Sequence, residues 1–273
     1  MVTPSLVVFQ TMFYIQVAVV ILCLIFGSVM DLLKREVSNI PWIIMAVVGL
    51  LTSIVLIIFS EDPRKVGGFF GFNVAFGLIL GLVLYYTGIM GGADAKAIMA
   101  LSLNTPVYIF NFAFLEQEVY NLIFIPNVFN TFFNWLLVMV IFYPLPLLFY
   151  NLYLKIRGRK LFENTNANFA SKILMMISGY LIPTVKALNR HDIVYSEKYD
   201  KETEKWNVIH FMQVVEVEEE EKFKKEVEED IKLTRRELIW VKVLPPGIVF
   251  LLIGYIVNLF VGNLLFLIYY FAL

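Results

Sequence analysis

Two aspartates lie where an apolar chain has little reason to carry a charge. Asp31 directly follows an uninterrupted apolar run, and Asp94 follows Gly91-Gly92-Ala93 at the start of another. An ionisable side chain at the depth of a membrane is costly, so such a residue is a functional candidate by default. The two positions are separated by one predicted pair of membrane spans, which puts both aspartates on the same membrane face.

Two carboxylates that meet in a partly desolvated site repel one another, so one of them holds a proton while the other is ionised. The ionised group can then take a proton from water while the protonated group donates to a peptide carbonyl or leaving amine. We therefore predict Asp31 and Asp94 as a catalytic pair that needs neither a metal nor a cofactor. Gly91 and Gly92 lack a Cβ, which permits close approach of an extended substrate.

Each aspartate also has a structural interpretation. Asp94 is a good N-cap for the helix that follows it, and Asp31 could be a solvated residue just beyond the end of a membrane span. Lys96 could stabilise the charged form of Asp94, or it could mark the cytoplasmic flank of a helix. Both interpretations stay open from the residues alone.

The composition requires a membrane around these residues. The chain has 273 residues, of which 59% are hydrophobic and 16% aromatic, and its mean hydropathy is +0.75; ordinary soluble domains are about 45–50% apolar. The net charge of −1 gives no basic field for nucleic acid. Cys23 is the single cysteine, which excludes an internal disulfide and a zinc module built on cysteines.

Six apolar stretches approach the length of about 20 residues that a membrane helix needs. The predicted spans are Leu6 to Met30, Pro41 to Ser60, Val66 to Gly88, Ala95 to about Leu115, Val128 to Leu154, and Pro246 to Leu273. The fourth is interrupted by polar residues and a proline around position 105, which predicts a short or kinked helix. The predicted fold is thus an all-α polytopic membrane protein with about six spans.

The lysines and arginines predict the orientation, because short cytoplasmic loops carry the excess of both. Lys34 and Arg35 follow the first span, Lys96 lies beside the third loop, and most other basic residues lie between spans five and six. By parity these all share one side. We expect this side to be the cytoplasm, with both termini outside the cell membrane.

The region between spans five and six predicts a cytoplasmic α+β insert. We divide the chain into residues 1–154 with five spans, the insert 155–243 and the last span 244–273. An apolar stretch at 173–177 is too short to span and predicts an interfacial helix. Two apolar runs, 192–195 and 208–215, flank the polar stretch 200–205 and predict a hairpin, and glutamates four residues before lysines at 218–232 predict a charged helix.

The sequences around both aspartates resemble one family. Asp31-Leu-Leu-Lys-Arg-Glu-Val-Ser-Asn39 resembles the first aspartate motif of type IV prepilin and archaeal preflagellin peptidases, and Gly91-Gly92-Ala93-Asp94-Ala95-Lys96 resembles their Gly-x-Gly-Asp motif. Ala93 replaces the second glycine of that motif. The Pro-Pro-Gly stretch 245–247 before the last span is similar to archaeal members with a soluble insert.

This resemblance implies an aspartyl endopeptidase that removes a short basic leader from type IV pilin-like or archaellin precursors at the cytoplasmic membrane face. Its substrates would be these precursors, and the lipid bilayer would surround it. Arg35, Glu36, Asn39 and Lys96, together with Gly91 and Gly92, are candidates for positioning substrate or supporting the motifs. His191 and His210 lie far from the aspartates in sequence and lack metal-ligand spacing.

Three other functions fit some of these features. A carrier could use Asp31 and Asp94 for proton or cation coupling, although transporter sites usually lie near the midplane of inverted repeats. A presenilin or signal-peptide-peptidase type of protease would share the Gly-x-Gly-Asp motif but expects Tyr-Asp where this chain has Met30-Asp31. A non-catalytic assembly protein is a third alternative.

Overall fold

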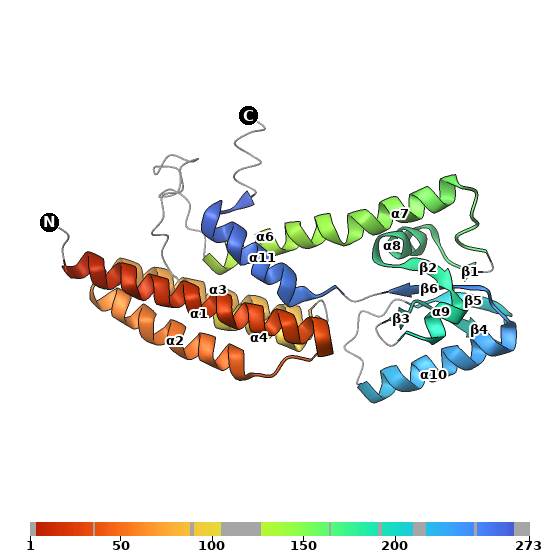
Figure 1. Cartoon of the computed structure of the whole chain (residues 1–273), viewed down its shortest axis with the longest axis horizontal. Helices are drawn as coiled ribbons and strands as arrows, with labels where there is room; N and C mark the ends of the chain where they lie inside the picture. Colours follow the sequence, from red (N-terminus) through yellow and green to blue (C-terminus); the bar gives the residue numbers. More distant parts are fainter. Residues whose placement is uncertain are drawn as a thin grey trace. The chain divides into compact units, whose positions relative to one another are not determined.

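The computed structural model describes residues 4–34, 36–87, 90–104, 127–163, 165–190, 193–209, 217–242 and 245–264 (Figure 1). The chain forms two compact units. The first comprises Met1–Val138 and Pro246–Leu273, and the second comprises Met139–Pro245. The first unit contains both aspartates, so its helices are the ones that position the candidate site.

The first unit is helical throughout its described part. Its helices are α1 (Pro4–Lys34), α2 (Ile40–Ile58), α3 (Pro63–Tyr86), α4 (Gly92–Leu101), most of α6 (Asn127–Phe142) and α11 (Gly247–Phe260). Proline stands in the first turn of α2 and of α3, where its missing N–H costs nothing. Asp62 caps α3 by accepting a 3.1 Å hydrogen bond from the backbone N–H of Lys65.

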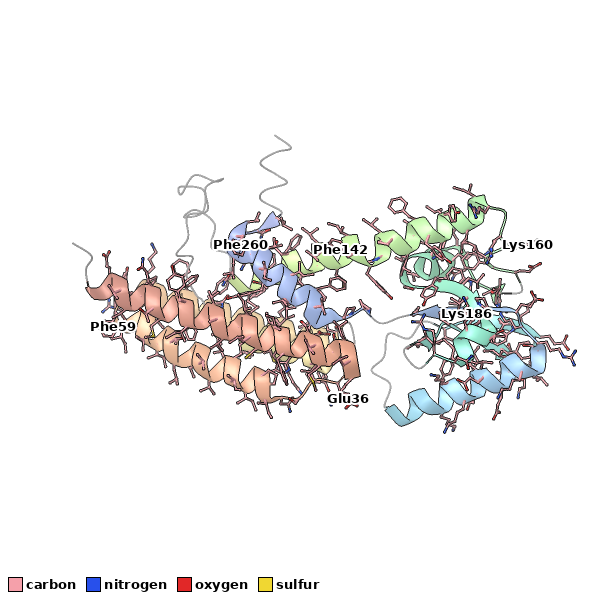
Figure 2. All side chains as sticks on the ribbon, in the orientation of Figure 1. Glu36, Phe59, Phe142, Lys160, Lys186 and Phe260 are labelled. Carbon is pink, nitrogen blue, oxygen red and sulfur yellow. The ribbon has the colours of Figure 1, made fainter. Side chains whose placement is uncertain are left out.

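Four helical segments are long and apolar enough to cross a membrane: Val7–Lys34, Ile40–Ile58, Pro63–Tyr86 and Asn127–Ile156. They coincide with four of the six predicted spans. Large apolar side chains cover their outer surfaces, including Phe59 and Phe142 (Figure 2). An exposed apolar surface of this extent is expected of a protein whose solvent is lipid.

The fourth and sixth predicted spans are represented by shorter helices. α4 has 10 residues and ends at Leu101, and the remainder of the predicted span falls in 105–126, outside the described residues. α11 has 14 residues, and the chain after residue 264 also lies outside them. At a rise of about 1.5 Å per residue, α4 is roughly 15 Å long, half the thickness of a bilayer core.

Glycines allow α4 to approach its neighbours closely. A Cβ on Gly81 of α3 would lie 2.5 Å from Met99 Cγ and 3.0 Å from the carbonyl oxygen of Ala95, and a Cβ on Gly77 would overlap Ser102. The Gly-x-x-x-Gly pair of α3 is therefore a packing surface, as its spacing predicts. The second such pair is packed more loosely: a Cβ on Gly67 would lie 3.7 Å from Ile57 Cγ2, and Gly71 has no atom within 4 Å of its Cβ position.

Buried polar side chains join the helices of this unit. Gln16 of α1 donates to Thr52 Oγ1 at 2.8 Å and to Ser53 Oγ at 2.9 Å, both on α2. Asn73 of α3 donates to the carbonyl of Ser102 at 2.7 Å. Between apolar helices such bonds stabilise association because the alternative is an unsatisfied polar group.

The second unit mixes helices with short strands. Its elements are α7 (Pro144–Ile156), β1 (Thr165–Asn166), α8 (Phe169–Ser178), β2 (Tyr180–Pro183), α9 (Thr184–Leu188), β3 (Val194–Tyr195), β4 (Glu197–Asp200), β5 (Lys205–Val208), α10 (Val217–Thr234) and β6 (Leu238–Lys242). One three-stranded sheet has the order β1-β5-β4 and the other β2-β6-β3. Trp240 and Tyr195 are buried in the cores beside them.

The hairpin lies around the predicted polar turn, but its strands differ from those expected. β4 and β5 pair antiparallel with Asp200 opposite Lys205, whereas β3, part of the first predicted run, pairs with β6 instead. Most of the second predicted run falls in 210–216, outside the described residues. The charged helix is confirmed as α10.

Candidate active site

Asp31 lies within the last turns of α1, not beyond its end, because α1 continues to Lys34. The side chain is partly exposed, but its Oδ2 atom is buried. One turn earlier on the same helix face, a Cβ on Gly27 would lie 2.7 Å from the ring of Trp42 and 3.2 Å from Ile248. This face of α1 therefore packs against α2 and α11.

Asp94 lies in the first turn of α4. The N-cap of α4 is Gly91, so the interpretation of Asp94 as the N-cap residue is wrong. Asp94 is the third helical residue, and its carboxylate accepts a hydrogen bond from the backbone N–H of Gly91. This is the backward reach of an acidic residue in a capping box, and it satisfies a donor that the helix leaves free.

The structure brings the two aspartates together. The Asp31 carboxylate lies close enough to act electrostatically on that of Asp94. Three helices meet at this place: α1 with Asp31, α4 with Asp94, and the first turn of α11, where Ile248 contacts α1 and Gly247 contacts Asp94. Two carboxylates in one partly buried site can act as an acid and a base together.

The two motifs are also joined by a direct contact. The Lys96 ammonium donates a 2.9 Å hydrogen bond to Oδ1 of Asn39, which immediately precedes α2. Both side chains are exposed. Lys96 therefore has a hydrogen-bond partner in the first motif. Neither earlier interpretation, stabilisation of the charged Asp94 or marking of the cytoplasmic flank, included this contact.

The other predicted residues are placed differently. Glu36 is exposed on the connection between α1 and α2 (Figure 2), and Arg35 lies outside the described residues. Gly91 is exposed at the start of α4, and a Cβ on it would lie 3.6 Å from Asp94 Oδ2; a Cβ on Gly92 would lie 3.4 Å from the Tyr85 ring. Gly91 thus leaves the backbone beside Asp94 exposed, whereas Tyr85 partly covers Gly92.

Sequence reasoning missed a residue in contact with Asp94. A Cβ on Gly247 would lie 2.5 Å from Asp94 Oδ1 and 2.6 Å from Oδ2. The Pro-Pro-Gly stretch was a visible signal, but it indicated only where the last helix begins. Its contact with a residue more than 150 positions earlier in the chain depends on tertiary packing.

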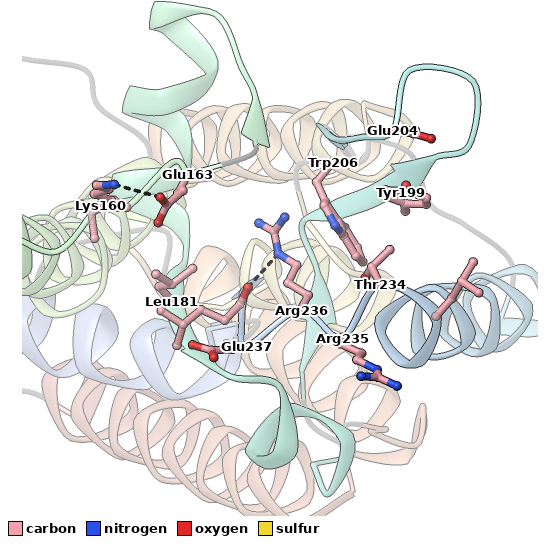
Figure 3. Close-up of a pocket in the computed structure, with 13 residues that line it drawn as sticks. Lys160, Glu163, Leu181, Tyr199, Glu204, Trp206, Thr234, Arg235, Arg236 and Glu237 are labelled. Carbon is pink, nitrogen blue, oxygen red and sulfur yellow. Dashed lines mark hydrogen bonds and ion pairs between the residues drawn. The ribbon is translucent and has the colours of Figure 1, made fainter.

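Within the described residues, no three of the histidine, cysteine, aspartate and glutamate side chains gather as metal ligands would. His191 and His210 lie outside those residues. The second unit contains a separate cavity of about 560 Å³, lined in part by Arg236, Trp206 and Glu237 (Figure 3). None of the predicted site residues lines it.

Both aspartates lie in a segment of the chain that matches a known protein family. Residues 18–145 match the model of the type IV leader peptidase family. The chain is 32% identical over 166 residues to a preflagellin peptidase of Methanococcus voltae; this alignment covers 60% of this chain and 66% of that protein. It is also 32% identical over 134 residues to a preflagellin peptidase of Methanococcus maripaludis; this alignment covers 47% of this chain and 55% of that protein. The chain thus spans less than two thirds of the length of either relative.

Proposed function

Because the chain belongs, over residues 18–145, to the type IV leader peptidase family, we propose that it is a membrane aspartyl endopeptidase with Asp31 and Asp94 as its catalytic residues. The observation that supports this proposal is the convergence of α1, α4 and α11, where the Asp31 carboxylate acts electrostatically on that of Asp94. In this mechanism the ionised aspartate activates a water molecule and the protonated one donates to the scissile peptide.

The surroundings of Asp94 support a preorganised site. Its carboxylate accepts the N–H of Gly91 and lies in the first turn of α4, where the helix dipole favours negative charge. A carboxylate that is already oriented at this position can take a proton from water without first reorganising. The exposed backbone at Gly91 gives an extended peptide a place to approach.

The substrate that we propose is the precursor of an archaellin or another type IV pilin-like protein, cleaved after its short basic leader. The two relatives are named preflagellin peptidases. We further propose six spans, an insert at 155–243, and cytoplasmic placement of Asp31 and Asp94, with both termini outside. The positions of Lys34 and Lys96, close to the aspartates, support this orientation.

An interfacial role for α8 is part of the same proposal. Phe169 is 81% exposed, and Ile173, one turn later on the same face, is 44% exposed. Met175 on the opposite face is buried, and the helix packs against α7, where Asn151 donates to the carbonyl of Met176 at 2.8 Å. An exposed apolar face on a helix anchored in this way suits the surface of a bilayer.

The test is cleavage of a candidate precursor in membranes that contain the full chain. Wild type is expected to remove the leader, which is seen as a mobility shift on a gel and a new N-terminus by mass spectrometry. Asp31→Asn and Asp94→Asn are each expected to abolish cleavage. Asp62→Asn is the matched control, because Asp62 is an exposed helix cap and asparagine caps equally well.

Leader removal by either aspartate variant at the wild-type rate would defeat the two-aspartate mechanism. A carrier predicts the opposite pattern: proton flux into liposomes that disappears in Asp31→Asn, with no precursor cleaved by wild type. That result would replace a peptidase with a transporter.

A further inference from the structure

The first residue of α11 lies directly against the carboxylate of Asp94. A Cβ on Gly247 would be 2.5 Å, 2.6 Å and 2.7 Å from Oδ1, Oδ2 and Cγ of Asp94. Carbon and oxygen atoms in ordinary contact are about 3.5 Å apart. Any residue other than glycine at this position would therefore require the carboxylate or the start of α11 to move.

The Asp94 carboxylate cannot move away without a cost. It accepts the N–H of Gly91, so displacement would break that bond at the start of α4. Ala95 adds a second constraint, because its N–H donates to the carbonyl of Gly91 at 3.1 Å and keeps the first turn of α4 closed. Asp94 is thus held between its own helix and Gly247.

Gly247 is fixed in turn by a tryptophan of α6. The indole Nε1–H of Trp135 donates to the carbonyl oxygen of Gly247 at 2.9 Å, and Trp135 is buried, with only 4% of its surface exposed. Two turns along α11, a Cβ on Gly254 would lie 2.6 Å from the backbone nitrogen of Trp135. α11 therefore packs directly on the backbone of α6, and the indole determines where its first turn lies.

We propose that Gly247 and Trp135 are positioning residues for the Asp94 carboxylate. The proposal rests on the proposed peptidase function. Trp135 holds the first turn of α11 by its indole hydrogen bond, and Gly247, with only a hydrogen in place of a side chain, forms the wall against which the carboxylate lies. The last helix thereby sets the distance between Asp94 and Asp31, which belong to two other helices.

Gly247→Ala tests the wall. A displaced catalytic group can cost roughly 100-fold in rate, so we expect kcat for leader cleavage to fall by about that factor while KM stays within about twofold. The pH–rate profile should also shift, because the spacing of the two carboxylates sets their proton affinities. Gly71→Ala is the matched control: it adds the same methyl group to a helix of the same unit, where no atom lies within 4 Å.

Gly179→Ala separates site geometry from stability. Its methyl group would lie 2.7 Å from the carbonyl oxygen of Val241 in the second unit, with no atom of Asp94, Gly247 or Trp135 among its nearest neighbours, so it should lower the unfolding temperature in detergent and leave the pH–rate profile of the folded fraction unchanged. Gly247→Ala with wild-type kcat and pH profile would overturn the proposal. So would a loss of kcat in proportion to the loss of folded protein.

Trp135→Phe tests the indole hydrogen bond to Gly247. It remains informative if the Gly247→Ala protein does not accumulate in the membrane. It keeps an aromatic ring but removes the N–H donor, and we expect roughly a 10-fold lower kcat with the same shift of the pH profile. A Trp135→Phe variant with an unchanged profile would refute the anchor. Wild type that cleaves no precursor refutes the proposed function itself, whereas cleavage that needs Asp94 but tolerates both changes refutes only this inference.

Discussion

The side-chain ammonium of Lys96 donates a 2.9 Å hydrogen bond to Asn39, and this bond joins the two segments that carry the aspartates. Lys96 is two residues after Asp94, and Asn39 is eight residues after Asp31. The bond therefore closes the connection between α1 and α2 onto the first turns of α4. It is a side-chain link between the two segments, and both of its residues are exposed.

The Lys96–Asn39 link predicts coupled effects on cleavage. Lys96→Met and Asn39→Ala should each lower the cleavage rate by a similar factor, and the double variant should be no slower than either alone, because both changes break the same bond. Since both side chains are exposed, the change in unfolding free energy should stay below about 1 kcal/mol. Rates of precursor cleavage in a double-mutant cycle measure this, with Lys65→Met as the control lysine. Additive losses would mean that the two residues act separately.

The contact of α3 with α4 predicts a rescue. Gly81→Ala places a methyl group against Met99 and should destabilise the first unit by about 1–3 kcal/mol, the usual cost of overpacking. Gly81→Ala combined with Met99→Ala should recover part of that loss, because Met99 Cγ is the nearest atom to the new methyl group. Thermal unfolding in detergent measures both, against Gly71→Ala. Equal stability of Gly81→Ala and Gly71→Ala would contradict the packing described for α3.

The second unit contains a buried ion pair whose removal should be costly. Arg236 Nη2 lies 2.7 Å from Glu197 Oε1, with side-chain exposures of 10% and 0%. Burial raises the pKa of the Glu197 carboxyl and lowers the pKa of the Arg236 guanidinium, because it disfavours both charges. Glu197→Ala leaves the guanidinium without its counter-ion and is expected to cost about 3–5 kcal/mol.

An exposed pair on the same unit is the matched control for this prediction. Lys160 and Glu163 are 3.0 Å apart with side-chain exposures of 76% and 57%. Glu163→Ala should change the unfolding free energy by less than about 1 kcal/mol. Urea unfolding followed by tryptophan fluorescence distinguishes the two, since Trp206 and Trp240 are buried in this unit. Similar midpoints for both variants would disprove the stated role of Glu197.

Tyr195 predicts a loss of stability at alkaline pH. Burial, with the negative charge of Glu228, raises the pKa of Tyr195 from 10.0 to about 12. The folded state then holds the phenol proton more tightly, so the stabilisation is complete below pH 10 and is lost as the pH rises toward 12. Two pKa units correspond to roughly 2.7 kcal/mol. Urea midpoints across this range should fall more steeply in wild type than in Tyr195→Phe, and parallel curves would argue against it.

The sequence was enough to predict that Asp31 and Asp94 share one membrane face, because motif spacing and span parity are properties of order along the chain. It also shows the Gly-x-x-x-Gly spacing of Gly77 and Gly81, which is typical of close helix packing. It could not separate them from Gly67 and Gly71, since the same small-residue spacing appears in both pairs and only the position of α4 decides which is covered. The same Gly-x-x-x-Gly spacing therefore packs closely at one end of α3 and loosely at the other, depending on which helix lies beside it.

The contact of Gly247 with Asp94 and the pairing of β3 with β6 were beyond sequence reasoning for a similar reason. Each depends on segments far apart in the chain, and the partner cannot be inferred from the residue type of a glycine or of a two-residue strand. The hairpin turn at 200–205 was predictable because its polar residues act locally. One strand was misplaced because the first apolar run contains β3, which pairs with β6 in the other sheet.

α4 ends where a helix in lipid would normally leave carbonyl oxygens without donors. Side chains of two other helices and of its own C-terminal turn supply them: Asn73 of α3 donates to the Ser102 carbonyl, Ser53 of α2 to the Leu103 carbonyl, and Asn104 to the Ala100 carbonyl. α4 is therefore held at both ends: at its first turn by the contacts of Asp94, and at its last turn by amide and hydroxyl groups of α2, α3 and its own C-terminal turn.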